Sequence, residues 1–285
     1  MKAPDFRYAR PGSLAEAYAL LAEHGDAAVP LAGGQSLMPA LNMRLSAPEL
    51  VVDIGALTAL RGIALDGNAV RIGALARHAE VLRSPIVAEH LPLIAEAMPH
   101  VGHVAIRNRG TFGGSIAHAD PAAELPACTV ALGARIVLGS AAGTREIAAA
   151  DFYTGLFETA RRTDELVLEI RIPSRPEGEV CAFLELSRRH GDYALAGVAA
   201  VARFEDGRMR DGRFVYFGCT DRPKPAERVL RATLDGPPDP DALSTAVAED
   251  VDPADSPGLR AATKAHLAAV LTRRALSVLQ QRRAT

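Results

Sequence analysis

Cysteine is scarce in this sequence, and its few cysteines lie far apart. Cys128, Cys181 and Cys219 are the only ones among 285 residues. They form no CxxC pair for a metal or an iron–sulfur cluster, and three isolated cysteines do not make an even disulfide set. Any iron–sulfur chemistry therefore belongs to another chain.

An excess of charge and long hydrophobic runs are absent as well. The net charge of −2 gives no broad basic field, although arginine is dense at 188–189 and 273–274, so we expect no nucleic-acid partner. No apolar run approaches the ~20 residues that cross a bilayer, and the first residues lack the apolar core of a signal peptide. We expect a cytoplasmic protein without a transmembrane segment.

Signatures of side-chain catalysis are missing too. The sequence has neither a G-x-S-x-G elbow nor a Ser-His-Asp arrangement, which leaves hydrolysis without support. His100 and His103 have no third metal-ligand candidate close in sequence. We therefore expect no catalytic side chain and no metal site.

The 48% hydrophobic residues are ample for a core in one large or two moderate domains.

Two glycine-rich segments carry most of the functional information. They are residues 31–36 (LAGGQS) and 109–116 (RGTFGGSI), and each follows an apolar stretch. Adjacent glycines let the backbone turn tightly and bring its N–H groups close to a ligand, and successive N–H groups can form a nest for anions. The pair predicts a site for a phosphate-bearing cofactor. The alternative is a purely structural role: a turn that binds no ligand for the first segment, and a helix-capping turn for the second.

The surrounding pattern alternates strands and helices. Ser13 and Glu16 predict a capping box for a helix that Gly25 stops. We expect helices over 86–98 and from Pro121 to Leu132. The expected strands are 27–31, 50–54, 69–73, 135–138 and 166–172.

A change of composition at residues 173–178 (PSRPEG) predicts a linker. After it we expect strands over 180–187, 195–204 and 213–217, then helices, the last over 259–279. We therefore predict a domain of residues 1–177, with subdomains of about 1–55 and 56–177, and a C-terminal domain of residues 178–285.

A nicotinamide-binding Rossmann unit is the obvious competing interpretation. The first glycine segment follows a strand, and Asp53 ends another strand about twenty residues later, where a ribose-binding acid would lie. The segment has no third glycine of a G-x-G-x-x-G motif, however, and Pro39 interrupts the expected helix. These mismatches argue against that fold.

Three separated motifs are similar to those of a known family. Residues 32–39 (AGGQSLMP), 111–121 (TFGGSIAHADP) and 188–194 (RRHGDYA) resemble the FAD-binding medium subunit of molybdenum hydroxylases, which include carbon monoxide dehydrogenase and xanthine dehydrogenase. The resemblance covers essentially the whole chain. It implies an α+β fold, with a two-part FAD-binding domain of the vanillyl-alcohol oxidase (PCMH) type followed by a smaller α/β C-terminal domain.

The resemblance also implies a function. Electrons would leave substrate at a molybdenum centre, cross 2Fe-2S clusters and reach FAD on this chain, which passes them to an external acceptor. The molybdenum cofactor would lie on a large partner subunit and the clusters on a small one, in a dimer of heterotrimers. The alternatives are a self-contained FAD-dependent oxidase or reductase of the same flavin fold, and a non-redox nucleotide-binding assembly module.

Specific residues follow from the same resemblance. The backbone of Ala32, Gly33, Gly34, Gln35 and Ser36 would hold the FAD pyrophosphate. The ribityl chain and flavin ring would lie along the second glycine segment, and a helix start and a C-terminal aromatic residue would approach the ring. These further cofactor-binding residues are Gly110, Thr111, Gly114, Ser115, Ile116, Ala123, Glu124 and Tyr193.

Glu124 and Tyr193 each have an alternative role. An acid in a first helical turn is favourable through the helix dipole alone, and a tyrosine often seals a domain interface. Some relatives carry a lysine near Leu184 or Glu185, which this chain lacks. Arg188 or Arg189 could replace that charge next to a reduced flavin, or could simply be solvated.

Overall fold

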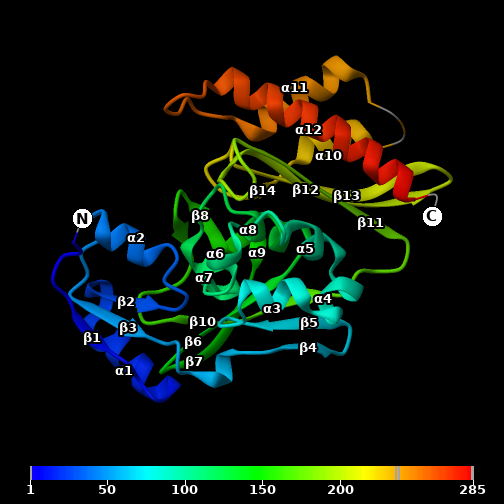
Figure 1. Cartoon of the computed structure of the whole chain (residues 1–285). Helices are drawn as coiled ribbons and strands as arrows, with labels where there is room; N and C mark the ends of the chain where they lie inside the picture. The colour runs from blue at the N-terminus through cyan, green and yellow to red at the C-terminus, as the bar shows by residue number, and fades with distance from the viewer. Residues whose placement is uncertain (1, 235, 237, 284–285) are drawn as a thin grey trace.

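Residues 2–234, 236 and 238–283 are described by the computed structural model, in which the chain forms three larger sheets and one two-stranded sheet (Figure 1). Each larger sheet contributes to its own hydrophobic core. The predicted α+β class is confirmed by this mixture of helices and strands.

The first part of the chain forms a parallel sheet of order β1-β3-β2. Its strands are β1 (Arg7–Ala9), β2 (Ala28–Leu31) and β3 (Leu50–Asp53). The helices are α1 (Leu14–His24) and α2 (Leu37–Asn42), with 3₁₀ turns η1 (Gly25–Ala27) and η2 (Thr58–Leu60). Buried residues of α1 and β3 form the core of this subdomain.

Two local predictions in this subdomain need correction. The Ser13 hydroxyl accepts from the Glu16 N–H at 3.2 Å, but the Glu16 carboxylate accepts from Gly12 rather than Ser13, so the capping box is half formed. Pro39 does not prevent a helix either. It lies in the first turn of α2, where a missing N–H costs no intrahelical hydrogen bond.

The middle of the chain forms a five-stranded antiparallel sheet of order β4-β5-β10-β6-β7. Its strands are β4 (Ile63–Asp66), β5 (Ala69–Gly73), β6 (Arg135–Ser140), β7 (Gly143–Ala148) and β10 (Leu166–Pro173). β8 (Tyr153–Gly155) and β9 (Glu158–Thr159) form the two-stranded sheet.

Short helices lie on one face of this sheet (Figure 1). They are α3 (His78–Arg83), α4 (Pro85–His90), α5 (Pro92–Ala97), α6 (Val104–Arg107), α7 (Phe112–His118), α8 (Glu124–Ala131) and α9 (Ala149–Phe152).

Two of the helices that we predicted here need correction. The single helix over 86–98 is two helices, because Leu91, which precedes Pro92, leaves the helical region with ψ 59°. The helix predicted to open at Pro121 begins at Glu124 instead, with Ala123 at its N-cap.

After β10 ends at Pro173, the chain forms an antiparallel sheet of order β11-β12-β13-β14. Its strands are β11 (Glu179–Ser187), β12 (Ala194–Glu205), β13 (Arg208–Phe217) and β14 (Lys224–Pro225). Helices α10 (Glu227–Thr233), α11 (Pro240–Val251) and α12 (Ala261–Arg282) cover its outer face in Figure 1.

The inner face of this sheet packs on α5 and α8, so these helices lie between it and the five-stranded sheet (Figure 1). Successive side chains of β11 point to opposite faces of the sheet, which produces this arrangement. Cys181 and Phe183 face the central core, whereas Ala182 faces the core formed with α10–α12. In the described part of the chain, no helix is long and apolar enough to span a membrane.

Candidate functional site

A cavity of about 490 Å³ lies where all three parts of the chain meet. Its walls come from β2 and the first glycine segment, the second glycine segment and the start of α8, the stretch before β10, and the turn before β12. The lining includes residues 32–36, 110–111, 113–115, 117–118, 120, 123–124, 161, 165–167 and 191–193.

The first glycine segment lines this cavity and has N–H groups without backbone partners. In the described structure, none of the N–H groups of residues 33–36 donates to a backbone carbonyl. Gly34 has φ 73°, in the left-handed region that favours glycine. Gly33 is needed for contact with the second glycine segment, because a Cβ there would lie 2.4 Å from the carbonyl oxygen of Arg109. These are the properties of an anion nest.

The second glycine segment is built differently from what we expected. The N–H groups of Phe112 and Gly113 donate to the carbonyls of Ala76 and Ala74, both at 2.9 Å. The Gly114 N–H donates to the Thr111 hydroxyl at 3.2 Å, which caps α7. The segment is therefore the start of a helix whose N–H groups are already bonded, and it offers the cavity mainly its Thr111 and Ser115 side chains.

His78 is a cavity residue that the sequence analysis missed. It is 5% exposed, and neither ring nitrogen makes a hydrogen bond of normal geometry. Burial, together with the charges of Arg107 and Arg77, lowers the pKa of His78 to about 4, so the ring is neutral. Its proximity to Gly110, about thirty residues later, follows from tertiary packing, and no local sequence signal marks it.

Acidic and aromatic residues form another part of the cavity lining. Burial raises the pKa of Glu124 to about 7, and the charge of Asp120 adds to the effect. Burial likewise raises the pKa of Asp120, whose carboxylate accepts from the Ala122 N–H at 2.9 Å. Tyr193 lies in the turn before β12 and is 70% exposed, which excludes the alternative that it seals a domain interface in this chain.

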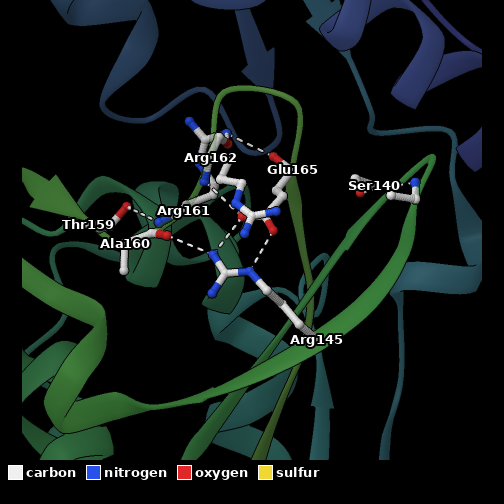
Figure 2. A network of polar contacts seen from close by, with 8 residues as sticks. Ser140, Arg145, Thr159, Ala160, Arg161, Arg162 and Glu165 are labelled. Atoms are coloured by element: carbon white, nitrogen blue, oxygen red, sulfur yellow. Dashed lines mark hydrogen bonds and ion pairs between the residues drawn. The ribbon is translucent and has the colours of Figure 1, made fainter.

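An arginine–glutamate network supports the cavity wall before β10 (Figure 2). Arg145 binds both carboxylate oxygens of Glu165, at 2.6 and 2.8 Å, and donates to the Ala160 carbonyl at 2.7 Å. Arg161 donates to the backbone carbonyls of Arg162 and Glu165. Burial favours a raised pKa for Glu165, but its hydrogen bonds with Arg145 and the Arg162 N–H outweigh burial and lower it.

Most residues assigned from the family resemblance line this cavity. Ile116 is different: its side chain is fully buried in the central core and does not line the cavity, because it points about 100° around α7 from the side chain of Ser115. Arg188 and Arg189 are exposed and also lie outside the lining. In the described residues, no group of three or more His, Cys, Asp or Glu side chains could hold a metal ion.

Comparisons with known proteins cover nearly the whole chain. Residues 4–175 match the model described as the FAD binding domain in molybdopterin dehydrogenase, and residues 181–279 match the CO dehydrogenase flavoprotein C-terminal domain.

Individual relatives are similar over the same length. The nicotine 6-hydroxylase medium subunit of Paenarthrobacter nicotinovorans is 41% identical, over 88% of this chain and 89% of that protein. The caffeine dehydrogenase subunit beta of Pseudomonas sp. (strain CBB1) is 38% identical, over 97% and 95%. Among solved structures, a carbon monoxide dehydrogenase chain from Hydrogenophaga pseudoflava superposes with a TM-score of 0.94, at 36% identity and 99% coverage of both chains.

Proposed function

We propose, from the premise that this chain belongs to the family of FAD-binding domains in molybdopterin dehydrogenases, that its central cavity holds FAD between the two glycine segments. The chain is the FAD-binding medium subunit of a molybdenum hydroxylase, an oxidoreductase subunit that transfers electrons. It functions in a complex with a large molybdenum subunit and a small iron–sulfur subunit.

The residues present fit an extended dinucleotide. The unbonded N–H groups of residues 33–36 suit a pyrophosphate, and hydrogen bonds to a charged group contribute roughly 1.5–3 kcal/mol each. His78 also lines the cavity, next to Gly110 of the second glycine segment. The cavity volume of about 490 Å³ is within the range of small-molecule sites. The free N–H groups are the observation that carries the assignment.

We assign the site residues by their place along the cavity. Ala32 to Ser36 hold the pyrophosphate, and Gly110, Thr111, Gly114 and Ser115 line the ribityl chain. Ala123 and Glu124 face the polar side of the flavin, and Tyr193 approaches its ring from the C-terminal domain. Ile116 supports this wall from the core side. All except Ile116 line the cavity.

FAD supplies the redox chemistry, since bound flavin can accept electrons from iron–sulfur clusters and pass them to an external acceptor. This chain's residues bind it, exclude water and set the protonation around it.

Two further proposals concern organisation: the domains divide near residue 177, and the complex is a dimer of heterotrimers. A cytoplasmic location is also proposed, which the free thiols of Cys128, Cys181 and Cys219 support.

The purified full chain tests the cofactor assignment. We expect it to bind FAD from solution, with a flavin absorption spectrum that bleaches on reduction and returns in air. Denaturation is expected to release the flavin. A covalent adduct, which would stay bound, would instead indicate a self-contained oxidase. The chain alone is expected to oxidise no hydroxylase substrate, and to support turnover only with its partner subunits. No flavin binding, or turnover without partners, contradicts the proposal.

A further inference from the structure

A second cavity, of about 690 Å³, lies beside the first glycine segment. Residues 32–35 line both cavities, but the rest of the lining differs. In the described structure, no residue after Arg109 lines the second cavity, so the C-terminal domain and the remainder of the second glycine segment take no part in it. The two cavities are therefore separate sites that share one wall.

Four arginines from separate parts of the chain line the second cavity. Arg10 follows β1, Arg61 follows η2, Arg77 precedes α3, and Arg109 begins the second glycine segment. The only carboxylate in the described lining is that of Asp53, at the end of β3. Four guanidinium groups against one carboxylate give this cavity a net positive charge. The cofactor cavity does not include any of these five side chains.

The carboxylate of Asp53 already has partners. It accepts from the Tyr8 hydroxyl and, at 2.8 Å, from the Gly55 N–H. Its ion pair is with Arg10, at 3.9 Å, and the Arg10 side chain is 60% exposed. Asp53, which the sequence analysis considered as a ribose-binding acid, therefore compensates at most the charge of Arg10.

The other three guanidinium groups do not pair with a carboxylate in the described structure. Arg61 donates to the Gly55 carbonyl at 3.0 Å, and Arg77 donates to the Arg109 carbonyl. Each guanidinium has five N–H donors, so most of them remain available to a ligand. Burial, followed by the charge of Arg61 and then that of Arg109, lowers the pKa of Arg77. These like charges repel one another, and an anion bound among them relieves the repulsion.

The chemistry of this lining favours an oxyanion. A guanidinium is planar, and its parallel N–H groups match two oxygens of a phosphate or a carboxylate. The described lining contains no aromatic side chain on which a base or a flavin ring could stack. The site therefore recognises charge and oxygen geometry, and it differs in this from the cofactor cavity.

We propose that the second cavity is an anion-binding site for a ligand with two or more adjacent oxyanion groups, of the diphosphate or dicarboxylate type. Arg61, Arg77 and Arg109 hold the anion, and Asp53 limits its affinity by repulsion. Such groups come either from a small anion in solution or from acidic side chains of a partner subunit. The inference goes beyond the proposed function, which assigns FAD to the other cavity.

The test titrates inorganic pyrophosphate into the FAD-loaded full chain in a calorimeter. FAD fills the first cavity, so that pyrophosphate meets only the second. We expect one pyrophosphate for each chain, with an affinity that falls as NaCl is added. Arg109→Gln and Arg61→Gln are each expected to weaken binding at least about ten-fold, because each removes charge-assisted hydrogen bonds. Arg109→Gln is the milder change, since no described residue pairs with that guanidinium.

Two further variants separate this role from a structural one. Asp53→Asn removes the negative charge but keeps an oxygen for the Gly55 N–H, so it is expected to tighten pyrophosphate binding several-fold. A folding defect does not produce a change of that sign. Arg83→Gln, at an exposed side chain of α3 outside both linings, is the matched control and is expected to leave the affinity unchanged.

The source of the anion is decided by repeating the titration with the assembled complex. Binding that persists there assigns the site to a free anion. Binding that disappears on assembly, with assembly itself weakened by Arg109→Gln, assigns it to acidic side chains of a partner subunit.

Three results overturn the inference. They are no saturable binding of pyrophosphate, binding that Arg109→Gln and Arg61→Gln leave unchanged, and an equal loss of FAD affinity in these variants, which would assign the arginines to the cofactor site. FAD affinity is expected to stay within about two-fold of the unmodified chain, measured by flavin fluorescence. Failure of the unmodified chain to bind FAD overturns the proposed function instead, and the titration of the chain without FAD, compared with Arg109→Gln, then still tests the anion site.

Discussion

Single glycines decide whether the two loops of the site can touch. Gly33 lies against the backbone of Arg109 and Gly110, which cannot rotate away as a side chain could. Gly33 is therefore required for the packing of the two loops, and it affects ligand binding through that packing. Gly34 acts through its positive φ, and Gly113 through its approach to Ala74.

Gly33→Ala is expected to reduce the free energy of unfolding by about 1–3 kcal/mol, because the added Cβ forces the loops apart. FAD affinity is expected to fall at least about ten-fold, since each lost charged hydrogen bond costs roughly 1.5–3 kcal/mol. Urea unfolding and fluorescence titration with FAD measure both. Gly12→Ala is the control, because its Cβ would meet nothing closer than a Glu16 carboxylate oxygen at 3.7 Å. Equal affinities in the two variants would contradict this account.

Glu185 is expected to make the protein less stable as pH rises. Burial of its carboxyl group raises its pKa from 4.5 in the unfolded chain to about 8 in the folded one, so the folded state binds more protons within that window. The free energy of unfolding then falls with rising pH, by at most about 1.4 kcal/mol per pH unit for one proton.

Glu185→Gln is expected to remove this decline and to raise stability at pH 8. Urea unfolding at pH 5, 6, 7 and 8 measures the slope. Glu89→Gln, at a side chain that is 77% exposed, is the matched control and is expected to keep the original slope. Parallel curves for Glu185→Gln and the unmodified chain would show that Glu185 is ionised in the folded state.

At the scale of elements, the stretch from β9 to β10 is held in place by one side chain from β7. Arg145 joins the Ala160 carbonyl and the Glu165 carboxylate, whose side chain is only 4% exposed (Figure 2). Because residues 161 and 165–167 line the cavity, this ion pair links the position of a loop to the shape of the cofactor site.

Arg145→Met is expected to cost about 3 kcal/mol, because it leaves a buried carboxylate without its cation. Arg145→Lys keeps the charge but not the two parallel bonds, so we expect an intermediate loss. The pKa of Glu165 is lowered, so the contribution is present above pH 4.5 and is lost as pH falls through the lower folded-state pKa. Urea unfolding at pH 7 and pH 3.5 tests this sign.

Arg135→Met is the control for that series. Arg135 and Glu146 pair at 2.8 Å with side chains 54% and 32% exposed, so its removal is expected to cost only about 0.5 kcal/mol. A loss as large as that of Arg145→Met would mean that burial of Glu165 is not the cause.

At the scale of the whole molecule, the cofactor cavity connects the parts of the chain. Its lining includes Gly34 from the first subdomain, Thr111 from the second and Tyr193 from the C-terminal domain. Each part has its own core, and the Arg282 guanidinium on α12 binds Glu96 across the boundary as well as the Cys181 carbonyl in its own domain. A ligand that contacts every wall therefore stabilises the molecule as one unit.

Free FAD at a hundred times its dissociation constant is expected to add about 2.7 kcal/mol to the free energy of unfolding. An equimolar mixture of FMN and AMP is expected to add less, because these fragments do not bridge the two ends of the cavity. Thermal unfolding followed by circular dichroism measures both. An equal gain from the fragments would mean that the ends bind independently.

Contiguous residues were enough to predict several elements and the family. The strand predicted over 69–73 is β5, and Gly25 ends α1 as expected, because periodicity and glycine conformations are local properties. The motifs at 32–39, 111–121 and 188–194 are likewise short runs of contiguous residues, and they identify the family. This is why FAD and the electron-transfer function could be expected from the sequence.

Tertiary structure alone decided which polar groups are available. Both glycine segments predict free N–H groups, yet those of Phe112 and Gly113 are bonded to a segment some forty residues earlier, while those of residues 33–36 are not. His78 likewise reaches Gly110, about thirty residues later in the chain. Hydrogen-bond satisfaction, burial and pKa depend on neighbours brought together by folding, and local patterns along the chain do not reveal those neighbours.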